Sequence, residues 1–277
     1  MRTDSDKKYL LIPGTFFLFF LFLIAPGHAG KAKKAIFQGR NIAHRGLFSP
    51  DQSVPENSLE AFRLAVESGY GIELDVQLSR DGQVVVFHDD TLERVCGRKA
   101  RVDELDYEEL KDLPLCGSEQ RMPLFSEVLA LVDGREPMIV ELKNGRRNRE
   151  LCEKTLALLT SYAGDYCIES FHPLIVAWFR FHAPKILRGQ LAQQKELYME
   201  SGMNGAEARI LAGTLLNFAA RPQFIAYCVG QKPLSVRIAQ ALGAMRVCWT
   251  SHDAANEAGN DTVIFEHYRP RVRFRKD

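Results

Sequence analysis

Four ionisable side chains that could do chemistry lie between residues 44 and 88. His44 and His88 each follow a short apolar run, and Glu73 and Asp75 lie two residues apart within another. Because side chains alternate along a strand, both carboxylates would point to the same side. Two buried carboxylates at that separation cannot both stay ionised without a cation or an arginine between them, and a hard divalent ion is the simplest solution. The pattern therefore predicts a metal site beside two histidines that could transfer protons.

Short apolar runs that alternate with segments of helical periodicity indicate the elements that would position these groups. Strands are expected at residues 41–44, 71–78, 84–88, 138–143, 166–171, 186–191, 224–227 and 246–250. Helices are expected from 59 to Gly69, after a cap at Asn57 or Ser58, and at 104–111, 124–132, 148–162, 174–182, 207–218 and 234–242. This series predicts an α/β fold, a TIM (β/α)8 barrel whose site lies at the C-terminal ends of the strands.

One connection is irregular, because too few residues separate the second and third strands for a crossover helix. The residues Arg80-Asp81-Gly82-Gln83 are typical of a tight turn, so this segment could instead form a hairpin. In either case His88 would lie near the two carboxylates.

Five ordered blocks resemble the signature of the glycerophosphodiester phosphodiesterase family. They are His44-Arg45-Gly46, Pro55-Glu56-Asn57-Ser58, Glu73-x-Asp75, Asp81-Gly82 and His88-Asp89. Further on, Ile139-Val140-Glu141-Leu142-Lys143 is similar to that family's third carboxylate strand, Glu169-Ser170-Phe171 to a later strand end, and Val247-Cys248-Trp249-Thr250 to its last strand. The resemblance covers residues 41–270 and implies a single barrel domain.

The resemblance implies that His44 and His88 act as general acid and base and that Arg45 contacts phosphate. It also implies that Glu73, Asp75 and Glu141 hold magnesium or calcium. The residue types support the same reading. A phosphodiester anion repels a nucleophile, so a catalyst needs positive charge on its oxygens, from a hard cation, Arg45 and Lys143, and a proton for the leaving alkoxide. Which histidine acts as the acid and which ion is bound both stay open.

Other residues have less certain roles. The family's Pro-Glu-Asn block lies beside the site, but Glu56 could equally be a carboxylate favoured by a helix N-terminus. Phe171 and Trp249 could line an apolar wall for the alcohol, or could be ordinary core residues. His172 stands where an acidic residue is expected, which puts substrate contacts at that rim in doubt.

Composition limits the partners. The formal net charge of +1 gives no general attraction to nucleic acid, so we expect no nucleic-acid partner. Residues 9–30 contain no Asp, Glu, Lys or Arg and could span a bilayer as a single-pass N-terminal anchor after the flank 1–8, or could be a cleaved signal segment. A basic linker at 31–40 and a basic tail at 271–277 would flank the barrel. Flanking charge and scattered cysteines favour a membrane location with the barrel facing the cytosol, against secretion after cleavage.

The expected function is metal-dependent hydrolysis of a glycerophosphodiester to glycerol 3-phosphate and an alcohol. One alternative is a lyase that releases a cyclic phosphate from a lysophospholipid-type substrate. Another is a membrane-tethered binding module without turnover. The head-group alcohol and the oligomeric state are not indicated by the sequence.

Overall fold

Eight parallel strands close into a barrel in the computed structural model, which describes the backbone of residues 4–274 and the side chains of residues 14–274. The order around the ring is β1-β9-β8-β7-β6-β5-β4-β2, and β2 pairs with β1 to close it. The strands are β1 Arg40–Ala43, β2 Gly71–Leu78, β3 Val84–Val86, β4 Met138–Leu142, β5 Tyr166–Ser170, β6 Leu187–Ala192, β7 Phe224–Cys228, β8 Met245–Ser251 and β9 Thr262–Phe265.

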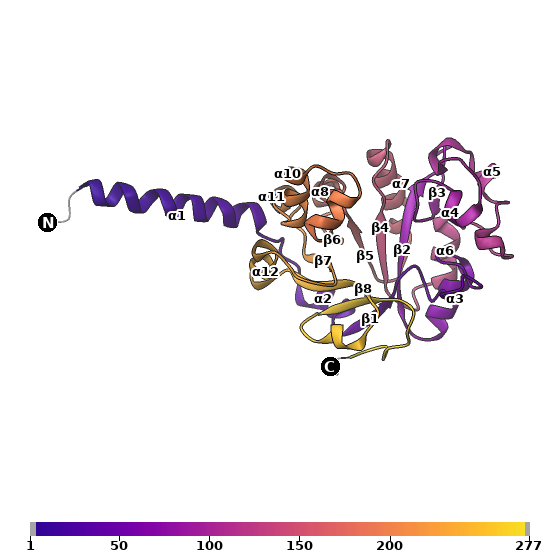
Figure 1. The fold of residues 1–277 in the computed structure, drawn as a ribbon. Helices are drawn as coiled ribbons and strands as arrows, with labels where there is room; N and C mark the ends of the chain where they lie inside the picture. Colours follow the sequence, from indigo (N-terminus) through magenta and orange to yellow (C-terminus); the bar gives the residue numbers. More distant parts are fainter. Residues whose placement is uncertain (1–3, 275–277) are drawn as a thin grey trace.

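Helices cover the outside of the ring (Figure 1). The α-helices are α1 Asp4–Ile24, α2 Lys31–Phe37, α3 Leu59–Glu67, α4 Glu93–Cys96, α5 Tyr107–Leu110, α6 Phe125–Val132, α7 Asn148–Thr160, α8 Pro173–His182, α9 Lys195–Glu200, α10 Gly205–Ala212, α11 Asn217–Ala220 and α12 Leu234–Ala241. Short 3₁₀ helices are η1 Val102–Glu104, η2 Leu115–Gly117 and η3 Ala254–Glu257. The predicted helix 207–218 is divided because Thr214 adopts a φ of +50°.

The expected set of barrel strands was wrong at two places. The segment around β3 forms a hairpin, antiparallel to β2, with Val76 opposite Val86, and β3 lies outside the closed ring. The eighth strand of the ring is β9, so the strand at Val247–Thr250 is not the last. Only the short η3 precedes β9, and this four-residue strand therefore lacks the helical pattern that marks the other repeats.

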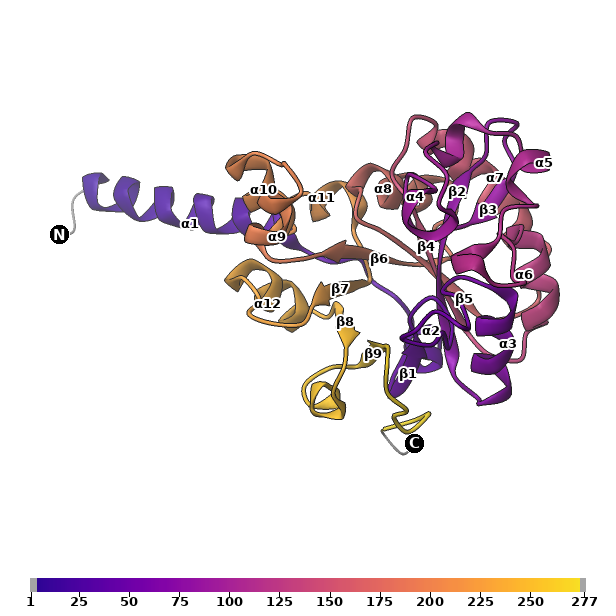
Figure 2. The same cartoon turned by 45° about the vertical axis from the view of Figure 1, so that its right-hand side comes forward.

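Residues 84–124, which begin with β3 of the hairpin, form a compact addition to the barrel. Figures 1 and 2 both place α4 and α5 on the side of the barrel opposite α1. This segment has its own buried cluster, which includes Val85, Leu92 and Leu110. It therefore holds β3, and the residues that follow it, against the end of β2.

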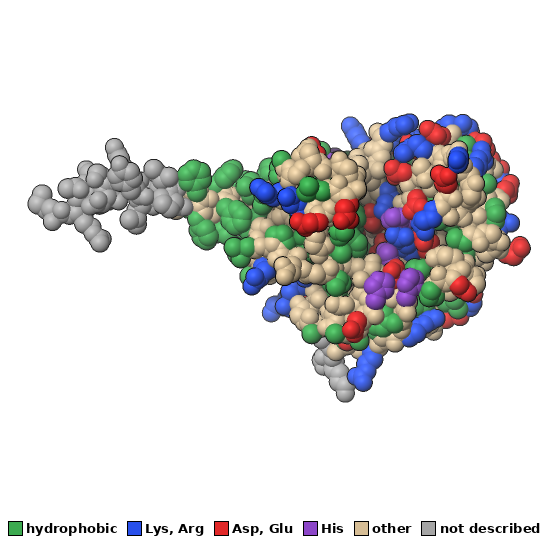
Figure 3. Space-filling model, in the orientation of Figure 1, with side chains coloured by type: hydrophobic (Ala, Val, Ile, Leu, Met, Phe, Trp, Pro, Cys, Tyr) green, Lys and Arg blue, Asp and Glu red, His purple; other side chains and the backbone are tan. Residues whose placement is uncertain are grey.

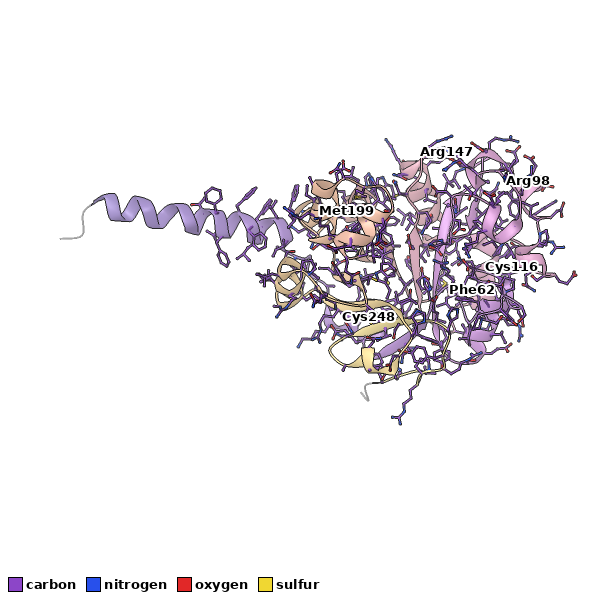
Figure 4. All side chains as sticks on the ribbon, in the orientation of Figure 1. Phe62, Arg98, Cys116, Arg147, Met199 and Cys248 are labelled. Atoms are coloured by element: carbon purple, nitrogen blue, oxygen red, sulfur yellow. The ribbon has the colours of Figure 1, made fainter. Side chains whose placement is uncertain are left out.

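Two apolar layers stabilise the barrel. One lies between the strands and α3, α6, α7 and α8, and it contains the fully buried Phe62, which Figure 4 labels on α3. The other fills the lower half of the ring with residues such as Ile139, Leu187 and Phe224. Charged groups in the ring are therefore confined to its upper half, at the strand C-terminal ends.

Residues 31–40 are not a free linker. They contain α2, whose last residue Phe37 is 2% exposed and packs under the lower core. The Phe37 carbonyl accepts a 2.9 Å hydrogen bond from the Thr262 hydroxyl. The lysines of this short helix make its apolar face hard to recognise in the sequence. In the structure, that apolar face closes the bottom of the barrel.

The predicted basic tail at 271–277 is also partly built into the fold. The Asn41 amide donates to the Val272 carbonyl at 3.0 Å, and the Phe274 amide donates to the Gly39 carbonyl at 2.8 Å. Residues 275–277 lie outside the described part of the chain.

The helix α1 projects from the barrel beside α11 and α12 (Figure 1). Its end is anchored, since Ile24 is fully buried and Arg221 donates to the carbonyl groups of Phe22 and Ala25 at 3.0 and 2.8 Å. Farther out, Phe16 is 70% exposed. No helix in the described residues meets the length and apolarity needed to cross a membrane. The predicted span 9–30 includes residues 9–13, whose side chains are not described, and the helix ends at Ile24, before the predicted boundary.

Candidate active site

Carboxylates from adjacent strands form one layer at the upper end of the barrel. Asp75 on β2 is level with Glu141 on β4, which is level with Glu169 on β5. Glu73, Asp75 and Glu141 are 2%, 1% and 7% exposed, and each offers an oxygen within 4.8 Å of the others. The sequence pattern indicates these three residues as ligands but gives no role to Glu169, although Glu169 also follows an apolar run.

The buried carboxylates are unequally compensated. Burial raises the pKa of Glu73 well above its usual value, and the charges of Asp75, Glu141 and Glu169 raise it further. Burial also raises the pKa of Glu141. It acts the same way on Asp75, but the positive charges of Lys143, His88 and Arg45 outweigh it, so the pKa of Asp75 is lowered. The layer therefore contains more carboxyl groups than the neighbouring cations can neutralise.

A hard divalent cation fits this layer. Glu169 supports the fit, because its Oε2 atom is buried without a hydrogen-bond partner and its pKa is raised by burial and then by Glu141. Magnesium and calcium both take carboxylate oxygen ligands. Glu73, Asp75 and Glu141 could hold such an ion, and the lost repulsion would offset part of the cost of burying them.

Lysine and arginine border the carboxylate layer. Lys143 Nζ lies 2.9 Å from Glu141 Oε1 and 3.3 Å from Asp75 Oδ1. Arg45 Nε lies 3.5 Å from Asp75 Oδ2, while Arg45 Nη1 donates to Glu56 Oε1 at 2.7 Å. Both cations are thus placed at the rim where phosphate oxygens could reach them.

His44 is held by a residue that sequence analysis missed. Its Nδ1 atom lies 2.7 Å from Glu266 Oε2, and its Nε2 atom lies 3.9 Å from Glu73 Oε2. Donation from Nδ1 to the carboxylate leaves Nε2 directed at the site. Burial lowers the pKa of His44, and the hydrogen bond to Glu266 opposes that effect. Glu266 directly follows the apolar residues of β9, which is the same signal that marked His44 and His88.

His88 has a similar arrangement. Its Nδ1 atom lies 2.6 Å from Asp89 Oδ1, and Arg94 donates to both oxygens of Asp89. Arg94 also donates to both oxygens of Glu56, at 2.7 and 2.9 Å. Glu56 is therefore a buried link between Arg45 and Arg94, and its pKa is lowered because these two cations outweigh the effect of burial.

The backbone is unusual where Arg45 and Asn57 meet. Both residues have positive φ values, +52° and +55°, a region that costs little for Asn but of order 1–3 kcal/mol for most residues. The backbone amide of Asn57 donates to the Arg45 carbonyl, and the backbone amide of Arg45 donates to Glu73 Oε2 at 3.1 Å. The side-chain nitrogen Nδ2 of Asn57 donates to Asp75 Oδ2 at 2.9 Å. Asn57, expected only as a possible helix cap, thus positions a carboxylate, and Ser58 is the cap.

Two cavities meet at this end of the barrel. One of about 380 Å³ is lined by both His44 and His88, and Figure 3 shows histidine, acidic and basic side chains gathered in a hollow of the surface. The other, about 680 Å³, is lined mainly by apolar residues. Phe171 and Trp249 line both cavities, with ring centroids 5.4 Å apart. His172 lines only the apolar one, where burial lowers its pKa.

Known proteins share this sequence pattern. Residues 44–268 match the model of the glycerophosphoryl diester phosphodiesterase family. A glycerophosphodiester phosphodiesterase of Bacillus altitudinis is 35% identical over 58% of this chain and 71% of its own length. A similarly named protein of Caldanaerobacter subterraneus is 39% identical over 38% of this chain and 45% of its own length. A lysophospholipase D of Rattus norvegicus is 33% identical over 53% of this chain and 49% of its own length. The chain thus spans about half the length of most of these curated relatives.

Solved structures share the fold. An Oleispira antarctica phosphodiesterase in complex with the product sn-glycerol-3-phosphate has a TM-score of 0.67 at 22% identity, over 84% of this chain and 94% of that one. A glycerophosphodiester phosphodiesterase from Thermotoga maritima has a TM-score of 0.60 at 25% identity, over 81% and 93%. Because the family model matches residues 44–268, most of the chain, the chain belongs to the glycerophosphoryl diester phosphodiesterase family.

Proposed function

We propose that this protein is a metal-dependent phosphodiesterase that hydrolyses glycerophosphodiesters to glycerol 3-phosphate and an alcohol. The observation that carries the proposal is the pair of histidines that line one cavity with the buried layer of carboxylates between them. Each ring is oriented through Nδ1 by its own carboxylate, which leaves Nε2 for the cavity.

The charged groups divide the work of phosphoryl transfer. A divalent ion on Glu73, Asp75 and Glu141 would supply Lewis acidity toward the phosphoryl oxygens and lower the pKa of a bound water or hydroxyl. Arg45 binds non-bridging phosphate oxygens through its planar fork, and Lys143 adds a point charge. Glu56 keeps the Arg45 side chain in place, since its carboxylate is itself held by Arg94.

His44 and His88 are the two groups that transfer protons to and from the reacting oxygens. One accepts a proton from the attacking water, and the other donates a proton to the leaving alkoxide. Glu266 and Asp89 stabilise the charged form of each imidazole, because a carboxylate that accepts from Nδ1 favours the imidazolium. Turnover therefore needs both rings, and Glu266 and Asp89 position them.

A second candidate substrate is a lysophospholipid. The apolar cavity of about 680 Å³ adjoins His88 and could hold an acyl chain while the phosphodiester lies at the carboxylates. The name of the Rattus norvegicus relative, lysophospholipase D, points the same way. Such a substrate also carries a hydroxyl that could attack phosphorus in place of water and release a cyclic phosphate.

The product assay tests these proposals. Glycerophosphocholine and a lysophosphatidylcholine are each incubated with the full-length protein in ¹⁸O-labelled water, with magnesium or calcium, and followed by phosphorus NMR. Hydrolysis predicts phosphomonoester that carries one ¹⁸O atom. A persistent cyclic phosphate without label would establish the lyase alternative. If a folded, metal-loaded protein turns over none of the diesters tested, the alternative of a binding module without catalytic activity is supported.

We also propose that α1 tethers the barrel to a membrane with the barrel in the cytosol. Its exposed aromatic residues support contact with a membrane, and the burial of Ile24 and the hydrogen bond from Arg221 to the Ala25 carbonyl attach the helix to the barrel. Release by cleavage near Gly30 would remove a segment that packs on the fold, where the Gly27 amide donates to the Pro222 carbonyl at 2.9 Å. Mass spectrometry of the cell-derived protein distinguishes the two, since an N-terminus near Gly30 refutes the anchor.

A further inference from the structure

A second group of metal-binding side chains lies at the edge of the barrel mouth, outside the carboxylate layer. His252 follows β8, and Glu266 and His267 follow β9. His252 Nε2 lies 3.5 Å from Glu266 Oε1, and His267 Nδ1 lies 3.9 Å from the same oxygen. The three residues each offer a ligand atom within 4.8 Å of the others. We refer to them as the His252–Glu266–His267 cluster.

The cluster differs chemically from the carboxylate layer. Two imidazoles and one carboxylate suit zinc and other transition metals, whereas magnesium and calcium prefer oxygen ligands alone. In the described part of the chain, Glu266 is the one polar partner of either ring. The two rings stack with centroids 5.7 Å apart, and their ligand atoms lie within 4.8 Å of each other and of a Glu266 oxygen.

The cluster can close on an ion without a change in the fold. The side chains of His252 and His267 are 59% and 36% exposed. Zinc–nitrogen bonds of about 2.0–2.1 Å require both rings to rotate, and the His267 ring would do so against Phe48, whose ring centroid lies 5.0 Å away. Glu266 is 17% exposed and already fixed by His44. Three protein ligands would leave a fourth tetrahedral position for water.

Glu266 connects the cluster to the candidate active site. Its Oε2 atom lies 2.7 Å from His44 Nδ1, and its Oε1 atom faces the two exposed histidines. An ion on Oε1 draws electron density from the carboxylate and makes Oε2 a weaker acceptor for the His44 ring. The ion would also place a positive charge near the His44 ring, on the side where the Glu266 carboxylate otherwise supplies a negative charge.

We propose that the His252–Glu266–His267 cluster is a binding site for zinc or a similar transition-metal ion, and that occupation lowers turnover by weakening the hold of Glu266 on His44. The binding part stands on the cluster alone. The inhibition part rests on the proposed phosphodiesterase function.

Binding is tested by calorimetric titration of the full-length protein with zinc chloride, in the presence of saturating magnesium to occupy the carboxylate layer. The variants are His252→Ala and His267→Asn. Asn is chosen at 267 because this residue has a φ of +62°, which Asn tolerates better than Ala. His182→Ala, which changes an exposed histidine at the C-terminal end of α8, is the matched control. The two cluster variants are expected to weaken zinc binding by at least about 10-fold, because loss of groups that only orient a ligand already costs that much.

Inhibition is tested with the same proteins. Zinc should lower diester turnover of the wild type and of His182→Ala, and magnesium should not reverse it. His252→Ala should keep its basal rate and resist zinc, because His252 does not line the cavity of His44 and His88. His267 does line that cavity, so the zinc response of His267→Asn is measured against its own zinc-free rate, and that rate should resist zinc.

Unchanged zinc affinity in both cluster variants overturns the site. Equal inhibition of all four proteins would mean that zinc acts at the carboxylate layer, and binding without inhibition would remove the coupling to His44. A protein without diester turnover fails the proposed function, but the titration still decides the site. Circular dichroism verifies that each variant is folded.

Discussion

The two halves of the barrel mouth are built on different principles. At β1, β2 and β4 charged side chains contact one another, as in the chain of contacts from Arg45 through Glu56 to Arg94. On the β5 and β8 side, Phe171 and Trp249 border an apolar cavity. Buried charge tolerates little movement, because an unpaired group costs several kcal/mol, whereas an apolar wall needs only volume and shape. The charged half could therefore carry out the proposed reaction, and the apolar half could hold the acyl chain of the proposed lysophospholipid substrate.

Metal removal should have the largest effect on turnover, and this effect should arise in the charged half of the barrel mouth. Chelation is expected to abolish diester turnover and to lower the melting temperature, because the repulsion within the Glu73, Asp75 and Glu141 layer is restored. An ion present at 100 times its Kd stabilises the fold by about 2.7 kcal/mol. Turnover and differential scanning calorimetry are measured with chelator and after addition of magnesium or calcium. Full activity in chelator would remove the metal from the mechanism.

Loss of either histidine should come next. His44→Ala and His88→Ala are each expected to lower turnover by about 100-fold to 10,000-fold, the usual range for a general acid or base. The fold should persist, because both side chains lie at the rim and not in the apolar layers. Steady-state kinetics is compared with that of His182→Ala, whose histidine lies on α8. A wild-type rate in His88→Ala would move the site elsewhere.

Replacement of Arg45, the proposed phosphate-binding arginine, should have an intermediate effect. Arg45→Lys keeps the charge but cannot form two parallel hydrogen bonds, and one hydrogen bond to a charged group is worth about 1.5–3 kcal/mol, or about 10-fold to 150-fold in kcat/KM. Arg98→Lys is the control, because Arg98 lies on the outer surface, as Figure 4 shows, 3.7 Å from Glu109. Equal kinetics for the two variants would argue against a phosphate contact at Arg45.

The smallest effect is expected in the apolar half, and it should depend on the substrate. Leu211→Ala removes part of the apolar cavity wall and is expected to lower kcat/KM for a lysophospholipid by about 10-fold, while glycerophosphocholine is turned over as before. Leu242→Ala, at an exposed site after α12, is the control. If both substrates lose the same factor, the cavity does not bind the acyl chain and the comparison between the halves fails.

Much of the site could be predicted because its residues follow strands. Gly71–Leu78 was expected with the bounds that the structure has, and the alternation along it places Glu73 and Asp75 inside the ring. His44, Glu141 and Lys143 follow or end other strands in the same way. The hairpin after β2 was indicated by its turn residues. Glu266 was missed because β9 is short and has no regular helix before it.

Local patterns of the sequence by themselves determined which residue types lie at strand ends and which way they point, because alternation and turn chemistry involve only neighbouring residues. Only the tertiary structure decided which strand closes the barrel, that α2 seals its bottom, and which carboxylate holds His44. His44 and Glu266 are 222 residues apart in the chain and meet because β1 pairs with β9. Such a contact depends on the closure of the whole ring, which no short segment encodes.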